Sequence, residues 1–417
     1  MLKKISTKDV QLGMFLQSME GSWLSNPFWK TKFVLLEQSD LDALLASGMP
    51  AVWIDNELGL DVSPAMPIEV PAAVPAVPTV PAVAAQRPAA PTPIRARSST
   101  PARVSMAEEM DRAAQMINRS RQAVTALFGE ARMGRAVNVE QCLPLVEDLT
   151  QSIVRNPSAL ISLARLKTKD DYTFMHSVAV CALMVSLSRQ LGLSEKQTQL
   201  AGFAGLLHDI GKITTPLEIL NKPGALSDAE FNVVRLHPER GYQVLKEGGS
   251  AVPDEALDVC LHHHERMNGS GYPHKLKGEE ISLMSRMGAV CDVYDAITST
   301  RPYKSAWDPA GSIQSMSQWT GQFDPVIFQA FVKCVGIYPV GTLVKLQSGR
   351  LAVVLEQNLA SLIAPKVKIF FSTKSKMPIP LLTLDLSRTD ANDRIVCREL
   401  AADWGFTHLD ELWRKQS

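Results

Sequence analysis

The sequence LLHDIGK at residues 206–212 ends an apolar helical run that begins at Leu200. His208 and Asp209 point about 100° apart around a helix, yet the longer imidazole and the carboxylate can both reach one ion beside the helix end. Lys212 follows His208 by four residues and lies on the same face. A cation next to a metal ion is favourable only where an anion lies between them. The stretch therefore predicts a metal site that binds an oxyanion such as phosphate.

Histidine is concentrated around this stretch. Of the eight histidines, all but His408 fall between residues 176 and 274. A single histidine is more often a hydrogen-bonded structural residue than a ligand, but imidazoles gathered beside Asp209 and Asp292 favour a transition-metal centre. The clustered residues are His176, His208, His237, His262, His263, His264 and His274.

Two further segments of this region carry polar residues in ordered patterns. The paired histidines at residues 263–264 precede a loop at residues 268–273, whose two glycines permit positive φ and whose proline makes the exit rigid. Asp292 and Asp295 share one face of an expected helix over residues 284–298. Buried acids on an apolar helix face need a partner, which a metal ion supplies.

The order of these motifs resembles the HD-GYP domain, a branch of the HD phosphohydrolase superfamily associated with bacterial cyclic di-GMP phosphodiesterases. The resemblance runs from Tyr172 to Pro325 and includes the strings HDIGK, HHER and GYP. It implies a metal-dependent phosphodiesterase that hydrolyses cyclic di-GMP to a linear dinucleotide or to GMP and so lowers the level of this second messenger. Two alternatives stay open: an HD-type phosphohydrolase of another nucleotide, and a receptor module that binds cyclic di-GMP without hydrolysing it.

The resemblance also implies roles for individual residues. Asp209 bridges two divalent ions and takes part in catalysis, and Lys212 contacts phosphate and is the general-acid candidate. Arg301 and Lys304 hold the substrate phosphates, with a solvated pair of helix-end charges as the alternative. The signature loop, in which Tyr272 has a packing role as its alternative, consists of Gly271, Tyr272 and Pro273. The implied metal ligands are His176, His208, Asp209, His237, His263, His264 and Asp292.

The nature of the metal follows partly from the ligands. Mixed imidazole and carboxylate ligation favours iron, manganese or a similar divalent ion over magnesium, and the resemblance implies iron or manganese. A pair of ions bridged by one carboxylate suits the hydrolysis of a phosphodiester, because it activates water and stabilises the leaving oxygen.

Three positions depart from the family pattern. Members with a third metal carry glutamate where this chain has Tyr172, so two ions are expected. Asn268 replaces the usual aspartate before the GYP loop, which puts the hydrogen bonding of the loop in question. His262 is additional, and since it points about 100° away from His263 on a helix, we expect it to support the ligands or the fold.

Composition and periodicity predict a multi-domain protein with an all-α HD-type catalytic domain. Apolar spacing of three and four residues marks the helices, and the linker holds ten of the 26 prolines. The first segment is also similar to the uncharacterised domain that often precedes HD-GYP domains. The expected segments are a small α/β module at 1–62, a Pro/Ala-rich linker at 63–105, a helical connector at 106–155, the HD-GYP domain at 156–336 and a β-rich appendage at 337–417.

Charge and cysteine usage limit the location and the partners. Lys plus Arg and Asp plus Glu both number 43, so no net positive field holds a long nucleic acid. The six cysteines lie far apart without a C-x-x-C pair, which is typical of reduced thiols in the cytoplasm. No signal peptide is expected, because Thr7, Lys8 and Asp9 interrupt the start of the chain before an apolar run can form. No transmembrane segment is expected either, because the longest apolar stretch, residues 70–85, carries four prolines. Cyclic di-GMP and diguanylate cyclase-type or other signalling proteins are the expected partners.

Overall fold

The structure is a computed structural model that divides the chain into two compact units near residue 100. The predicted linker at 63–105 lies outside the described residues. These residues are 2–20, 33–36, 38–46, 50–60, 106–133, 139–164, 172–222, 224–247, 252–299, 307–358 and 360–414.

The N-terminal unit contains an antiparallel sheet with the strand order β1-β4-β2-β3 and one helix, α1. In β4, Val52 and Ile54 are fully buried while Trp53 between them is exposed, which is the alternation expected of a sheet with one covered face. The predicted α/β module is confirmed, and the strands that apolar runs did not reveal are β1 and β2. The elements are β1 Leu2–Ser6, β2 Phe15–Glu20, β3 Phe33–Val34, α1 Gln38–Ala46 and β4 Ala51–Asp55.

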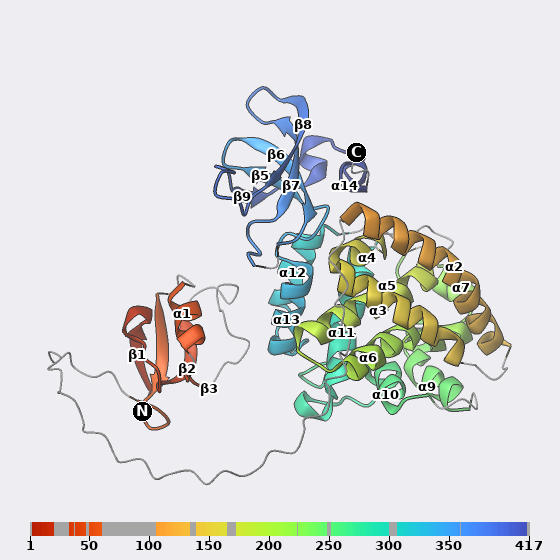
Figure 1. The fold of residues 1–417 in the computed structure, drawn as a ribbon. Helices are drawn as coiled ribbons and strands as arrows, with labels where there is room; N and C mark the ends of the chain where they lie inside the picture. Colours follow the sequence, from red (N-terminus) through yellow and green to blue (C-terminus); the bar gives the residue numbers. More distant parts are fainter. Residues whose placement is uncertain are drawn as a thin grey trace, which may run out of the picture. The chain divides into compact units, whose positions relative to one another are not determined.

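The second unit begins with a helical bundle, which confirms the all-α prediction (Figure 1). Its central helix α5 is buried from Phe174 to Ser188 and packs against α6, α11 and α13. None of the described helices has both the length and the apolar composition that crossing a bilayer requires. The helices are α2 Met106–Arg132, α3 Leu143–Arg155, α4 Pro157–Ala164, α5 Tyr172–Gln190, α6 Glu195–Leu207, α7 Leu217–Leu220, α8 Asp228–Val234, α9 His237–Glu247, α10 Asp254–His262, α11 Leu283–Thr298, α12 Pro309–Gln318 and α13 Pro325–Val335.

Local sequence signals determine where several of these helices begin. The Ser194 hydroxyl accepts the Gln197 backbone N–H, and the Gln197 side chain accepts the Ser194 N–H, which forms a capping box before α6. Asp308 and Asp324 cap α12 and α13, each followed by a proline at the first helical position. These caps fix the helix starts independently of the packing.

The C-terminal residues form a five-stranded antiparallel sheet in the order β8-β7-β6-β5-β9. One side of this sheet packs with Trp413 of α14 and with Met106 and Met110 of α2, so the first helix after the linker supports the appendage. The β-rich prediction is confirmed, and the short, partly exposed strand β9 is additional. The elements are β5 Leu343–Leu346, β6 Arg350–Glu356, β7 Lys366–Ser372, β8 Met377–Asp385, β9 Ile395–Arg398 and α14 Asp410–Arg414.

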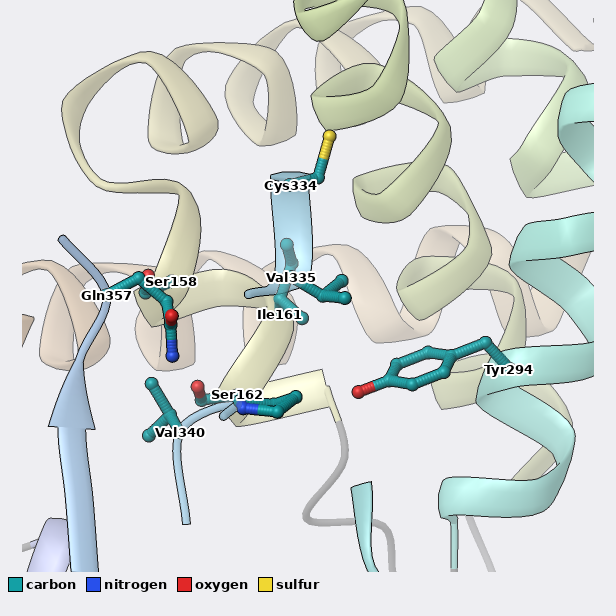
Figure 2. Close-up of a pocket in the computed structure, with 9 residues that line it drawn as sticks. Ser158, Ile161, Ser162, Tyr294, Cys334, Val335, Val340 and Gln357 are labelled. Carbon is teal, nitrogen blue, oxygen red and sulfur yellow. The ribbon is translucent and has the colours of Figure 1, made fainter. Parts of the chain in front are cut away.

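A cavity of about 10 Å³ lies where this sheet meets the helices, which is room for roughly one water molecule. Figure 2 shows the Tyr294 hydroxyl of α11 directed into the cavity, with Ser162 of α4 and Val340 on other sides. The Tyr294 ring also packs edge-on against Phe331 of α13 at a centroid distance of 5.0 Å. The joint is therefore closely packed and too small for a nucleotide.

Candidate metal centre

Helix ends and one helix middle bring all seven predicted ligand residues together. His176 lies in the first turn of α5, His237 begins α9, and Asp292 projects from the middle of α11. The ligand-type atoms form two groups in which all atoms lie within 4.8 Å of one another. One group is His176, His208, Asp209 and Asp292, and the other is Asp209, His237, His263 and His264.

Asp209 belongs to both groups because its two carboxylate oxygens face different histidines. Its Oδ2 lies 3.2 Å from His176 Nε2 and 3.4 Å from His208 Nε2. Its Oδ1 lies 3.2 Å from His237 Nε2 and 3.7 Å from His263 Nε2. This is the arrangement that a bridging carboxylate needs.

Hydrogen bonds from the outer ring nitrogens orient four of the histidines. The Nδ1 atoms of His208, His237 and His263 lie 2.8, 2.7 and 3.0 Å from the backbone carbonyls of Gly205, Val234 and Val259. His176 Nδ1 lies 2.6 Å from Asp295 Oδ2. Each Nδ1–H donates outward, so Nε2 is the ring nitrogen that faces the site, as in known metal sites.

The nitrogen and oxygen atoms that face the site show whether these residues fit a metal ion. His237 Nε2 and His263 Nε2 lie 3.2 Å apart, and both face Asp209 Oδ1. Among the described residues, buried Asp209 Oδ1 and His208 Nε2 have no hydrogen-bond partner. Acceptors that face one another in a buried space need a cation between them. The donor set therefore fits divalent metal ions.

The protonation states of the aspartates and histidines also bear on metal binding. Burial opposes ionisation of Asp209 and Asp292, but surrounding positive charges and N–H donors outweigh it and hold the pKa of each carboxyl well below its usual range. Burial, followed by neighbouring histidine charges, lowers the pKa of His264 to about 3 and also lowers that of His263. Burial also lowers the pKa of His176, but its hydrogen bonds to three aspartates raise it to about 10. The carboxylates are thus ionised and His263 and His264 are neutral, as metal ligands must be, whereas a bound ion would displace the proton that His176 holds.

Gly211 lets the HDIGK segment approach α9. A Cβ atom at this position would lie 1.9 Å from the His237 carbonyl oxygen and 2.5 Å from the Gly241 nitrogen. No other residue fits without moving this backbone. The contact places Asp209 beside His237 and so joins the two halves of the centre.

Lys212 lies on the solvent side of the centre and forms an ion pair with Asp209 Oδ2. Its side chain is 28% exposed, in contrast to 1% for the Asp209 side chain. The ammonium group therefore lies at the boundary between the buried carboxylate and the solvent, where an incoming anion can reach it.

The GYP loop covers the second group of ligands. The Tyr272 ring stacks on the His264 ring, with centroids 4.7 Å apart and an interplanar angle of 29°. Burial and the charges of two aspartates raise the pKa of Tyr272, so its hydroxyl is protonated. Of the two glycines expected to adopt positive φ, Gly269 does so at 78°, whereas Gly271 is required because a Cβ atom would lie 2.5 Å from the Glu265 Cα.

Asn268 keeps the hydrogen bonds of the loop. Its Oδ1 accepts the Ser270 backbone N–H at 2.9 Å and the Ser270 hydroxyl at 2.7 Å. An aspartate oxygen in this position would accept the same two bonds, so the replacement preserves this feature of the turn.

The remaining predicted residues lie at the edge of the described site or outside it. His262 Nδ1 bonds Asp258 at 2.7 Å and its Nε2 bonds His274 at 3.0 Å, away from both ligand groups. Arg301 and Lys304 lie outside the described residues, as does the Tyr172 side chain. Asp295, which orients His176, was not among the predicted site residues. Its position on the same helix face as Asp292, three residues later, could have identified it.

Comparisons with known proteins identify relatives of this chain. A family model described as an HD domain matches residues 147–327, and a domain of unknown function, DUF3391, matches residues 2–142. The chain is 52% identical over 414 residues to the cyclic di-GMP phosphodiesterase PA4108 of Pseudomonas aeruginosa, covering 99% of this chain and 96% of that protein.

Two further relatives each match less than half of this chain. The chain is 37% identical over 203 residues to the cyclic di-GMP phosphodiesterase response regulator RpfG of Xanthomonas campestris, covering 48% of this chain and 53% of the relative. It is 35% identical over 178 residues to the 3'3'-cGAMP-specific phosphodiesterase 1 of Vibrio cholerae, covering 42% of this chain and 41% of that protein. The HD-domain match at residues 147–327 contains the seven predicted ligand residues.

Proposed function

We propose that this chain, which belongs to the family of HD-domain cyclic di-GMP phosphodiesterases, hydrolyses a phosphodiester bond of cyclic di-GMP. The observation that carries the proposal is the buried set of ligand atoms divided into two groups by the single carboxylate of Asp209. The 52% sequence identity to a protein named as a cyclic di-GMP phosphodiesterase, over nearly the full chain, supports the choice of substrate.

In this proposal the two groups of residues hold two divalent ions, iron or manganese, and Asp209 is shared between them. When bound, such ions lower the pKa of water and stabilise negative charge on phosphoryl oxygens. The protein keeps this centre in order through the carbonyl and carboxylate partners of the histidine Nδ1 atoms.

Lys212 supplies the chemistry that the ligands cannot. Its ammonium group pairs with Asp209 and is partly exposed, so it can donate a hydrogen bond to a phosphate oxygen and a proton to the leaving oxygen. Gly271, Tyr272 and Pro273 shape the wall beside His264. Arg301 and Lys304, which lie outside the described residues, remain predicted phosphate contacts.

The proposal also covers the reaction product, the cellular location and the signalling partners. Hydrolysis of one bond gives a linear dinucleotide, and hydrolysis of both gives GMP. Activity in the cytoplasm would lower the concentration of the messenger that diguanylate cyclases make, which is why such signalling proteins are proposed partners. The reduced state of the six cysteines supports this location.

A second cyclic dinucleotide is the main alternative substrate, because one relative is named as specific for 3'3'-cGAMP. That relative matches 42% of this chain at 35% identity, compared with 99% at 52% for the cyclic di-GMP enzyme. A receptor without activity is disfavoured because every implied ligand residue is present and the ligand atoms face one another.

The test is purification without oxygen, metal analysis, and identification of the products from cyclic di-GMP and from 3'3'-cGAMP on the same preparation. We expect two ions per chain and faster turnover of cyclic di-GMP. Folded protein that binds three ions or none would contradict the metal assignment, and faster turnover of 3'3'-cGAMP would contradict the substrate.

A further inference from the structure

Arg235 is a half-buried cation beside the metal centre that the predicted site residues do not include. It lies in the short turn between α8, which ends at Val234, and α9, which begins at the predicted ligand His237. Within the described part of the chain, no carboxylate forms an ion pair with its guanidinium group. Its five N–H donors therefore need acceptors from solvent or from a ligand.

Two hydrogen bonds fix the turn that carries Arg235. Its backbone N–H donates to the Phe231 carbonyl at 2.9 Å, which closes the last turn of α8. The carbonyl of Val234 accepts from His237 Nδ1 at 2.7 Å. Because these bonds hold the residues before and after it, Arg235 keeps a constant place relative to His237.

The side chain of Arg235 reaches towards the signature loop. Its Cζ atom lies 4.8 Å from the centroid of the Tyr272 ring and 5.8 Å from that of the half-exposed Phe231 ring. Tyr272 in turn stacks on the His264 ring. The guanidinium is thus separated from a predicted metal ligand by a single aromatic ring, and cation–π contacts orient it without using its N–H donors.

A cyclic dinucleotide carries two phosphodiesters, and only one of them can lie at the metal centre during hydrolysis. The other is displaced by the length of one nucleotide and needs a cation of its own. Guanidinium binds phosphate through two parallel hydrogen bonds, and an unpaired, pre-oriented arginine loses little freedom in forming them.

We infer that Arg235 binds the second phosphodiester of the cyclic dinucleotide, the one that is not being hydrolysed. This inference rests on the proposed function and deepens it, because it makes Arg235 a specificity residue for substrates with two phosphates. It adds to the contacts predicted for Arg301 and Lys304 and to that of Lys212 at the reacting phosphate.

The test compares two substrates on the same metal-loaded preparations. Cyclic di-GMP has two phosphodiesters, and bis(p-nitrophenyl) phosphate has one. We expect Arg235→Ala to lower kcat/KM for cyclic di-GMP by about 10- to 100-fold, mainly through KM, since a hydrogen bond to a charged group is lost. Turnover of the nitrophenyl diester and the bound metal should stay unchanged. Arg235→Lys should recover only part of the loss, because lysine keeps the positive charge but cannot form the two parallel hydrogen bonds.

The matched control is Arg189→Ala, which removes an exposed arginine from the far end of α5. It should leave both substrates unaffected. Equal losses on both substrates for Arg235→Ala would assign the residue to support of the metal centre, and an unchanged KM for cyclic di-GMP would remove it from the binding site.

These outcomes are separable from failure of the proposed function. A wild-type enzyme that cleaves the nitrophenyl diester but neither binds nor cleaves cyclic di-GMP would overturn the substrate, and the phosphate contact with it. A wild-type enzyme that cleaves both, with an Arg235→Ala variant indistinguishable from it, would overturn the contact alone.

Discussion

The buried ligand layer of the site and its half-exposed rim are built by different means. His208 and Asp209 are 0% and 1% exposed, and a hydrogen bond to the Gly205 carbonyl, one turn earlier in α6, orients the His208 ring. On the rim, Lys212 is 28% exposed at its side chain, and Arg235 contacts aromatic rings and pairs with no carboxylate among the residues that the structure describes. The ligand layer is arranged to hold cations, whereas the rim presents cations that have room to meet an anion.

The largest effect should come from the residue that joins the two ligand groups. Asp209→Ala removes the carboxylate shared by both, and we expect loss of bound metal and of turnover to background. Tyr272→Ala, which removes only a stacked ring, should cost much less. Metal analysis and turnover of both variants check this order. Retention of metal and equal losses would show that Asp209 is no bridge.

The rim should respond differently, and Lys212→Ala is the sharpest case. We expect full metal occupancy with kcat/KM lowered by about 10²-fold, the usual scale for losing a proton donor or a charge in the transition state. Bound metal, melting temperature and turnover should be measured on one preparation. Near-normal turnover with a lower melting temperature would assign Lys212 a structural role.

Asp295→Asn separates ligand orientation from ligation. The variant weakens the hydrogen bond that orients His176 but keeps all predicted ligands, so we expect metal affinity to fall by about 10- to 100-fold. Excess metal should restore its turnover, which it cannot do for Asp209→Ala. A titration of activity against metal concentration measures the shift. If high metal concentrations fail to restore activity, Asp295 is a metal ligand or is needed for folding.

The smallest effect is expected for Asn268→Asp, which introduces the residue usual in the family. Since the asparagine oxygen already accepts both bonds from Ser270, we expect turnover and melting temperature to change little. Asn268→Ala, which removes the acceptor, should weaken the loop and raise KM. A large gain of activity in Asn268→Asp would contradict this expectation. It would mean that the aspartate usual in the family acts through its negative charge and not through the hydrogen bonds of the turn.

The ligand residues and the helical class could be predicted from the sequence because both signals are local. Residue chemistry within short strings such as HDIGK and HHER identifies metal ligands, and apolar periodicity identifies helices. The helix ends at Asp308 and Asp324 also follow from adjacent residues, through a cap and a proline. The strands β1, β2 and β9 were missed because each is short and interrupted by polar residues, so its apolar signal is weak.

Only the tertiary structure decided how these strings meet. The division of the ligands into two groups around Asp209 depends on contacts between helices far apart in the sequence, including the close approach at Gly211. The same is true of Asp295, whose partner His176 lies 119 residues away, and of Arg235, which reaches Tyr272 from another element. The sequence by itself determined which chemical groups are available, because residue type decides what an atom can ligate. Their roles depended on packing, because distance and orientation between remote segments decide which groups share an ion, a proton or a substrate.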